Sequence, residues 1–164
     1  MEKKIAVFPG SFDPFTKGHA HVVEKALEIF DEVIIFIADN PSKKRMFDKR
    51  IEFERIQKMY FKEMEQGRIN VSIQEGTVVN IASLFNAKFI VKGVRSTADA
   101  DYEIYQADVN KWLGGLQTVL IPCDKEYSHI SSTLVRSLMS ITGEFTEEAK
   151  KKIDKLMWRD SPAG

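Results

Sequence analysis

The fold is decided near the N-terminus, by the stretch Ile5-Ala6-Val7-Phe8-Pro9-Gly10-Ser11-Phe12-Asp13-Pro14-Phe15-Thr16-Lys17-Gly18-His19. Its first four residues form an apolar run, which predicts a buried strand ending at Pro9-Gly10. Thr16 is placed to cap the helix that follows. In that helix the apolar residues recur at i, i+3, i+4 and i+7, which is one helical face: Val23, Ala26, Leu27 and Phe30.

The rest of the chain repeats this alternation. Further strands are predicted at 33–38, 69–73, 89–91 and 118–121. Asp48 is expected to cap a long helix reaching Met64, and further helices are predicted at 78–85, 98–113, 131–140 and 147–158. Strands alternating with helices favour a doubly wound α/β fold with a mostly parallel, five-stranded sheet. We expect a single domain over residues 1–160, with a disordered tail at 161–164.

Composition and charge exclude several classes of protein. The 164 residues carry 24 Lys and Arg against 24 Asp and Glu, so the formal net charge is zero. A neutral chain lacks the positive field that coating nucleic acid or an anionic membrane requires. Cys123 is the single cysteine, which excludes an intrachain disulfide. No stretch approaches the ~18 apolar residues that span a bilayer, and a cytoplasmic protein is the simplest expectation.

Ligands of doubly wound sheets bind beyond the carboxyl ends of the strands, which here directs attention to the loops at 9–19, 39–47, 92–101 and 122–133. In the first loop, Gly10 allows a sharp turn, and Gly18 leaves room where a ligand would approach. His19 falls in the first helical turn, where free N–H groups and the helix dipole favour anions. The alternative is that Thr16 is an ordinary cap and His19 an ordinary surface histidine. Gly10-Ser11-Phe12-Asp13-Pro14 directly after the strand, with Thr16-Lys17-Gly18-His19 opening the helix, favours function.

The last loop carries the second motif, Ile130-Ser131-Ser132-Thr133-Leu134-Val135-Arg136. Three consecutive hydroxyl residues at a helix start offer side-chain and backbone donors to a triphosphate, whereas plain capping needs only one of them. Arg136 lies one turn beyond Ser132, and its role stays open.

These motifs resemble the nucleotidyltransferase superfamily, which also includes the class I aminoacyl-tRNA synthetases. Within it the chain is similar to the phosphopantetheine adenylyltransferases, from about Ile5 to Arg136. The family-like stretches are Thr16-Lys17-Gly18-His19, 130–136, Asn40-Pro41-Ser42-Lys43-Lys44-Arg45-Met46-Phe47, Lys92-Gly93-Val94-Arg95, 98–103 and Asn110. The length excludes a tRNA synthetase, because no tRNA-binding module is present.

The resemblance implies a Rossmann-like nucleotidyltransferase fold and adenylyl transfer from ATP to 4′-phosphopantetheine, giving 3′-dephospho-coenzyme A and pyrophosphate. His19 would be the catalytic residue. The ATP-binding residues would be Ser11, Phe12, His19, Gly93, Val94, Arg95, Glu103, Tyr127, Ser128, His129, Ile130, Ser131, Ser132 and Thr133. The residues binding phosphopantetheine would be Ser11, Lys43, Val78 and Lys92. The cofactor would be Mg²⁺, held mainly by phosphates and water, and the assembly a homohexamer.

Two positions depart from the family pattern. Lys92-Gly93-Val94-Arg95 stands where Arg-Gly-Leu-Arg is usual, which replaces a bidentate guanidinium by a point charge. Ala100 stands where an aromatic residue is common. Both bear on substrate affinity.

Alternative interpretations remain for several features. Lys43-Lys44-Arg45 could be a solvated loop, and Cys123 is interpreted as packing. Trp112 and Trp158 are expected in the core or in subunit contacts. A sister enzyme acting on nicotinamide mononucleotide, or with CTP on a polyol phosphate, is disfavoured by Lys43 and 92–95. A non-catalytic nucleotide sensor is disfavoured by His19.

Overall fold

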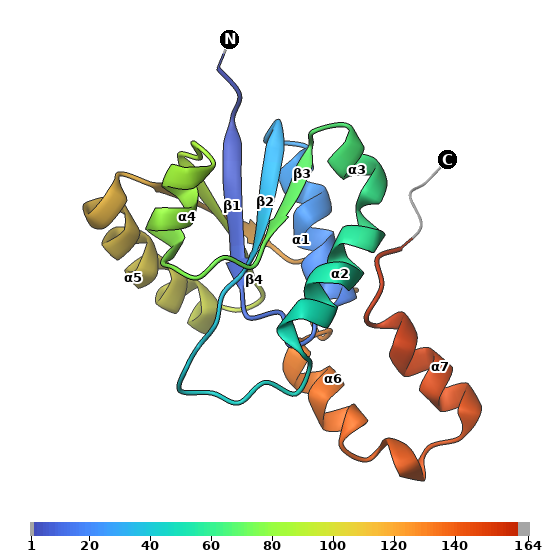
Figure 1. The fold of residues 1–164 in the computed structure, drawn as a ribbon. Coiled ribbons are helices and arrows are strands. Elements are labelled where there is room, and N and C mark those ends of the chain that lie inside the picture. The colour runs from blue at the N-terminus through green and yellow to red at the C-terminus, as the bar shows by residue number, and fades with distance from the viewer. Residues whose placement is uncertain (1, 161–164) are drawn as a thin grey trace.

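The computed structural model describes residues 2–160 and contains one sheet of five parallel strands (Figure 1). They are β1 (Ile5–Gly10), β2 (Glu32–Ile37), β3 (Ile69–Ser72), β4 (Phe89–Val94) and β5 (Gln117–Pro122), in the order β3-β2-β1-β4-β5. All four neighbouring pairs are parallel, which confirms the predicted doubly wound sheet. The chain adds strands outward from β1 to β3 and then returns to add β4 on the other side of β1. The strand order therefore reverses between β1 and β4.

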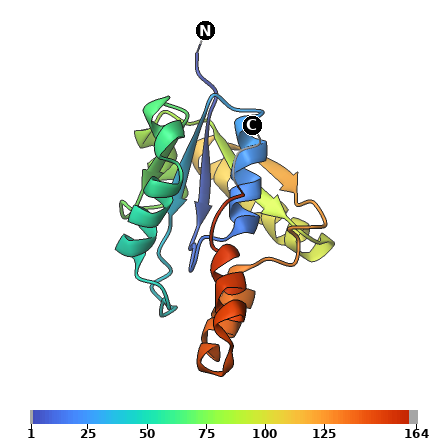
Figure 2. The ribbon, with the colours of Figure 1, turned by 90° about the vertical axis from the view of Figure 1, so that its right-hand side faces the viewer.

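Helices cover both faces of the sheet. They are α1 (Lys17–Leu27), α2 (Lys49–Met59), α3 (Phe61–Glu65), α4 (Val78–Leu84), α5 (Thr97–Gly114), α6 (Ser132–Met139) and α7 (Glu147–Lys155), with a 3₁₀ turn at Thr142–Glu144. Figure 1 shows α1, α2 and α3 on one face and α4 and α5 on the other. Helices α6 and α7 extend beyond the carboxyl ends of the strands (Figures 1 and 2).

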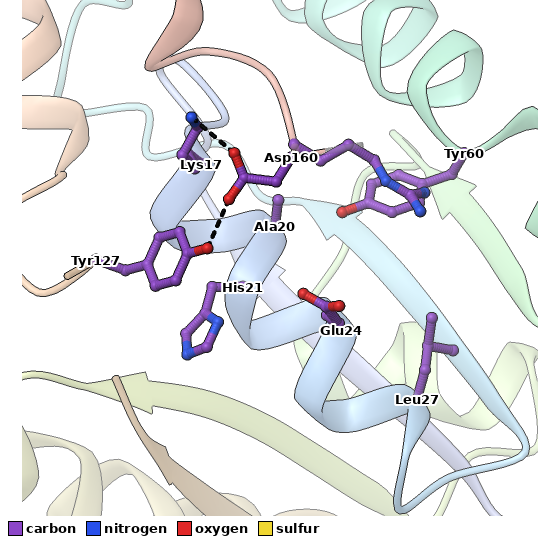
Figure 3. A pocket seen from close by; sticks show the side chains of 9 residues that line it. Lys17, Ala20, His21, Glu24, Leu27, Tyr60, Tyr127 and Asp160 are labelled. Atoms are coloured by element: carbon purple, nitrogen blue, oxygen red, sulfur yellow. Dashed lines mark hydrogen bonds and ion pairs between the residues drawn. The ribbon is translucent and has the colours of Figure 1, made fainter. Parts of the chain in front are cut away.

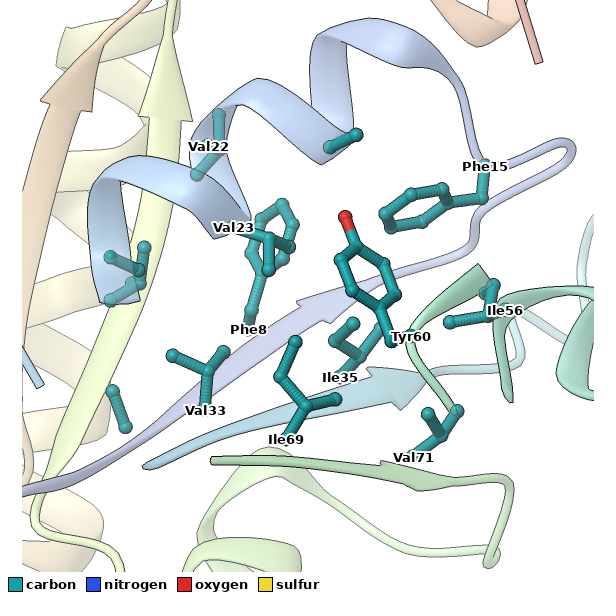
Figure 4. Packing of buried hydrophobic residues seen from close by; sticks show 14 of the residues in the cluster. Phe8, Phe15, Val22, Val23, Val33, Ile35, Ile56, Tyr60, Ile69 and Val71 are labelled. Atoms are coloured by element: carbon teal, nitrogen blue, oxygen red, sulfur yellow. The ribbon is translucent and has the colours of Figure 1, made fainter. Parts of the chain in front are cut away.

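The side chains of β1 and β2 alternate between two apolar cores. Phe8, Val33 and Ile35 point toward the α1–α2 face, whereas Val7 and Ile34 point toward the α4 face. Figure 4 shows the first of these cores. A strand buried on both faces has a continuous apolar sequence, which is why these segments are readable from sequence alone.

The structure corrects two expectations and narrows a third. The helix predicted from Asp48 to Met64 is two helices, since Tyr60 leaves helical geometry at φ −114° and ψ 22°. An apolar face at i, i+4 spacing does not distinguish one helix from two that share that face. Trp112 and Trp158 were expected in the core or in subunit contacts; they are 84% and 41% exposed, so of these two alternatives only subunit contacts remain. The last helix ends at Lys155, three residues before the predicted end.

The predicted tail at 161–164 lies outside the described residues. The caps at Thr16 and Asp48 are confirmed, and the C-cap of α5 is Gly115, which adopts φ +69°. Within residues 2–160, no helix combines the length and the apolar composition needed to cross a membrane.

Candidate active site

A cavity of about 310 Å³ opens where β1, β4 and β5 end and where α1 and α6 begin. It lies at the reversal of strand order, as expected for this class of sheet. The cavity brings together most of the residues predicted to bind ATP: Ser11, Phe12, His19, Gly93, Arg95, Glu103, Tyr127, Ile130, Ser131, Ser132 and Thr133. Lys92 also lines it. Val94, Ser128 and His129 are not among its lining residues.

His19 closes the N-terminal cap of its own helix. The hydroxyl of Thr16 accepts a hydrogen bond from the His19 amide at 3.5 Å, and the Thr16 amide donates to His19 Nδ1 at 2.9 Å. This reciprocal pair is a capping box in which histidine takes the place that Glu or Gln usually occupies. Because Nδ1 accepts a hydrogen bond from the backbone, the neutral ring carries its own proton on Nε2.

Aromatic rings enclose the imidazole of His19. The ring centroids of Phe12 and Phe15 lie 5.0 Å and 5.4 Å from that of His19, and Phe8 lies 6.3 Å away. Burial, followed by repulsion from Arg95, Lys92 and Arg55, lowers the pKa of His19 from 6.5 to about 3. His19 is therefore a neutral hydrogen-bond donor at pH 7, not a resident cation.

The first loop is held in an uncommon conformation. Phe12 is 1% exposed and has φ +44°, a region that L-residues rarely adopt. A Cβ at Gly10 would lie 2.7 Å from the Phe12 ring, so only glycine leaves room for that ring. The Arg45 guanidinium fixes the turn from outside, donating to the carbonyl oxygens of Ser11 at 2.5 Å and Phe12 at 3.0 Å.

Asp13 joins the first loop to two other segments. Its carboxylate accepts hydrogen bonds from the amides of Met46 at 3.1 Å and Phe47 at 2.7 Å. Its carbonyl oxygen accepts one from Arg136 Nη1 at 2.9 Å, which ties α6 to the first loop. The sequence did not reveal the roles of Arg45 and Asp13, because their partners lie more than thirty residues away. The basic run after β2 was the one available signal.

The three hydroxyl residues of the second motif have different partners. Ser131 caps α6 by accepting from the Leu134 amide at 3.1 Å. Ser132 Oγ donates to the carbonyl of Pro14 at 2.8 Å, and Thr133 Oγ1 accepts from Arg136 at 3.2 Å. The amides of the first turn of α6 have no partner within the helix, as in α1. Two positive helix ends therefore flank the same cavity, which favours a bound anion.

The cations of the cavity are paired with carboxylates. Lys92 Nζ lies 3.4 Å from Glu103 Oε1, and Arg95 Nε lies 3.2 Å from Asp99 Oδ2. Lys92 lies in the second half of β4 and Arg95 directly follows the strand, whereas their partners lie on α5. Asp99 was not singled out from the sequence. These pairs keep two positive groups beside the cavity.

Neighbouring cavities hold the two remaining residues that are predicted to bind phosphopantetheine, Val78 and Lys43. Val78 lines one of about 250 Å³ with Ser11, Lys92 and Glu103. Lys43 lines another of about 350 Å³, again with Ser11. Ser11 thus borders all three spaces, whereas Lys43 and Lys92 share none of them.

No group of three or more His, Cys, Asp or Glu side chains suited to a metal ion occurs in the described part of the chain. Asp99 and Glu103, the carboxylates that line the 310 Å³ cavity, are already paired with cations.

Comparison with known proteins places this cavity in a family. The model of the cytidylyltransferase-like family matches residues 7–138. A phosphopantetheine adenylyltransferase of Porphyromonas gingivalis is 44% identical over 140 residues, covering 85% of this chain and 90% of that relative. One from Thermotoga neapolitana is 33% identical over 161 residues, covering 98% of each chain.

Solved structures share the fold at lower identity. Plasmodium falciparum nicotinic acid mononucleotide adenylyltransferase superposes with a TM-score of 0.61 at 21% identity, covering 92% of this chain and 90% of that one. A bifunctional nicotinamide mononucleotide adenylyltransferase from Francisella tularensis superposes with a TM-score of 0.64 at 18% identity, covering 98% of this chain and 46% of that one.

Proposed function

Because the chain belongs to the phosphopantetheine adenylyltransferases, within the cytidylyltransferase-like family, we infer that it transfers the adenylyl group of ATP to 4′-phosphopantetheine. The products are 3′-dephospho-coenzyme A and pyrophosphate, a step of coenzyme A biosynthesis. The observation that carries this function in the structure is the placement of His19 between two helix N-termini in one cavity.

The reaction needs little covalent chemistry from the protein. An oxygen of the phosphopantetheine phosphate attacks the α-phosphorus of ATP, a P–O bond forms, and the bond to the β-phosphate breaks with both electrons leaving on pyrophosphate. The nucleophile is already an anion and needs no general base. Catalysis then consists of aligning two anions and stabilising the charge that develops between them.

We propose that His19 donates from Nε2 to the α-phosphate in the transition state. Its Nδ1 is occupied by the Thr16 amide at 2.9 Å, which supports a fixed orientation for that donor. Arg95 and the N-terminus of α6 would hold the phosphate chain of ATP. Ser11, which borders all three cavities, would contact both substrates, and Lys92 would hold the acceptor phosphate. Val78 would line the pantetheine groove, and Lys43 would assist from the cavity on the other side of Ser11.

A Mg²⁺ ion is proposed as the cofactor. When bound, it would neutralise phosphate charge and polarise the group under attack. The carboxylates that line the cavity are paired with cations, so phosphate oxygens and water would supply most of its ligands.

We also propose a homo-oligomer, a hexamer by family resemblance, working in the cytoplasm. One helix, α5, exposes five large apolar side chains: Tyr102, Ile104, Tyr105, Trp112 and Leu113. A surface of this kind on one helix supports burial against another subunit. Light scattering coupled to gel filtration measures the mass of the assembly.

The test of the function is pyrophosphate release with ATP and a panel of phosphorylated acceptors, followed by identification of the product by mass. We expect turnover with 4′-phosphopantetheine and none with nicotinamide mononucleotide or a polyol phosphate. Turnover only with nicotinamide mononucleotide would assign a sister activity. Tight ATP binding without pyrophosphate release under any condition would leave a nucleotide sensor.

A further inference from the structure

The segment after α7, Leu156–Asp160, returns to the body of the molecule and crosses the start of α1 (Figure 2). We call it the C-terminal strap. The Leu156 carbonyl accepts a hydrogen bond from the Lys17 amide at 2.7 Å, which starts this contact at the first residue of α1.

Two arginines hold the strap in place. Arg55 of α2 donates to the Met157 carbonyl and lies 5.7 Å from the centre of the Trp158 ring. Arg159 of the strap pairs with Glu63 at 2.7 Å and lies over the Tyr60 ring at 4.7 Å. The strap is therefore anchored on α1, α2 and α3, and its last described residue, Asp160, is brought to a defined place.

Asp160 bridges two segments that border the 310 Å³ cavity, the start of α1 and the loop before α6. Its Oδ1 lies 2.9 Å from Lys17 Nζ, and its Oδ2 accepts the Tyr127 hydroxyl at 2.6 Å (Figure 3). Lys17 opens α1 two positions before His19, whereas Tyr127 lies in the loop between β5 and α6. A short hydrogen bond to an ionised carboxylate is among the stronger polar contacts.

Tyr127 separates two cavities. One is the 310 Å³ cavity that we assign to ATP, and the other is a space of about 50 Å³ beneath the strap, large enough for water only. The Tyr127 ring stacks on His21 of α1 at 4.3 Å, so α1 supports one face of the ring and Asp160 fixes its hydroxyl. The position of this wall of the ATP cavity depends on both contacts.

The loop that carries Tyr127 also approaches α1 closely. A Cβ at Gly18 would lie 2.6 Å from the Ile130 carbonyl oxygen and 3.6 Å from that of Tyr127. A small displacement of the loop from α1 would therefore alter the gap in which ATP phosphates are expected to meet His19. The bridge through Asp160 acts across this same gap.

We propose that Asp160 is a positioning residue for ATP: it fastens the Tyr127 loop to the start of α1 and thereby sets the width of the nucleotide cavity. The proposal rests on the assignment of that cavity to ATP. It predicts an effect on the binding of ATP and not on that of phosphopantetheine, because the strap contacts neither Val78 nor Lys43. It also predicts little effect on overall stability, since the Asp160 side chain is 55% exposed.

The test is calorimetric titration of the full chain with ATP and, separately, with 4′-phosphopantetheine. Asp160→Ala should weaken ATP binding about threefold to tenfold, the value of one hydrogen bond, and leave phosphopantetheine binding unchanged. Tyr127→Phe should weaken ATP binding to a similar degree. The double variant should be no weaker than the weaker single variant, because both substitutions remove the same contact.

Asp154→Ala is the matched control. It removes the same charge from the neighbouring end of α7, where the Asp154 carboxylate has no ion pair or hydrogen bond within residues 2–160, and ATP affinity should stay at the wild-type value. Unchanged ATP affinity in Asp160→Ala would overturn the proposal, and so would equal losses for both ligands or additive effects in the double variant. These outcomes do not depend on turnover. A wild-type protein that binds ATP but makes no dephospho-coenzyme A would instead contradict the proposed function.

Discussion

The Thr16 amide lies 2.9 Å from Nδ1 of His19, so the side chain that we propose to act on phosphate also completes the cap of the helix that carries it. The N-terminal cap of α1 and the proposed catalytic side chain are thus parts of one hydrogen-bonded structure. The cap occupies Nδ1, so Nε2 carries the proton of the neutral ring and is the atom that we propose to donate to phosphate. The first two predictions test these two roles separately.

Substitution of His19 should separate capping from catalysis. In His19→Asn, the oxygen of the introduced side-chain amide can take the place of Nδ1 as acceptor, but no atom replaces Nε2. We expect kcat and kcat/KM to fall together by about 10²–10³, as when an oxyanion-hole donor is removed, with little change in ATP affinity. His19→Gln places an amide near the position of Nε2 and should retain more activity. A near-normal kcat in His19→Asn would remove His19 from the mechanism.

The stability of the ligand-free protein should depend on the protonation of His19. Its pKa is about 3 in the folded chain and 6.5 in the unfolded chain, so below pH 6.5 the unfolded state binds a proton that the folded state excludes. The contribution of His19 therefore fades above pH 6.5, and between pH 6 and pH 4 the free energy of unfolding of the wild type should fall by about 1 kcal/mol per pH unit more than that of His19→Asn. Denaturant titrations of wild type and His19→Asn at several pH values measure this pH dependence. Parallel pH dependences in the two proteins would contradict the lowered pKa.

Gly18 tests the close approach of the second motif to α1. In an open helix, Gly→Ala stabilises by about 1 kcal/mol. Here the added carbon would lie 2.6 Å from the Ile130 carbonyl oxygen, a backbone atom, so the loop has to move. We expect Gly18→Ala to raise the KM for ATP about tenfold or more. Gly143→Ala, where a Cβ meets nothing within 4 Å, is the control and should leave KM unchanged.

Much of the fold could be predicted because it depends on local patterns. The apolar runs of β1 and β2, the caps at Thr16 and Asp48, and the alternation of strands with helices are all short-range features. The break at Tyr60 could not be predicted, since the apolar face continues across it.

The site residues, too, divide into those that local sequence patterns predict and those that depend on contacts between distant parts of the chain. The loops that form the cavity could be predicted because the carboxyl ends of parallel strands meet at one edge of the sheet, whereas most of the individual lining residues came from the family resemblance. The supporting contacts were missed: Arg45 on the Ser11 carbonyl and Asp160 on Tyr127 each join residues more than thirty positions apart. No local sequence pattern specifies such pairs. The ion pair of Lys92 with Glu103 was missed as well, because only the packing of α5 on β4 brings the two side chains together.

Lys92 provides a test of how the acceptor phosphate is held. Lys92→Met should raise the KM for phosphopantetheine strongly, because it removes a counter-charge and leaves the Glu103 carboxylate, 14% exposed, beside an anion. The free energy of phosphopantetheine binding that is lost should exceed the ~0–1 kcal/mol that an exposed ion pair contributes. Adding Glu103→Gln to Lys92→Met should reverse part of this rise in KM. Lys92→Arg should preserve or improve KM.

Lys88→Met is the control for this series, since Lys88 is 65% exposed and pairs with Glu2 at the surface. Its kinetics should match wild type. Wild-type kinetics in Lys92→Met, at varied phosphopantetheine and saturating ATP, would assign the acceptor phosphate to other residues.

The fate of labelled phosphate oxygen tests the central claim most directly. The wild-type protein would be given unlabelled ATP and 4′-phosphopantetheine whose phosphate carries ¹⁸O, and both products would be analysed by mass spectrometry. Attack by the acceptor phosphate on the α-phosphorus predicts that all the label is recovered in dephospho-coenzyme A and none in pyrophosphate. Label in pyrophosphate, or consumption of ATP without labelled dephospho-coenzyme A, would contradict the account.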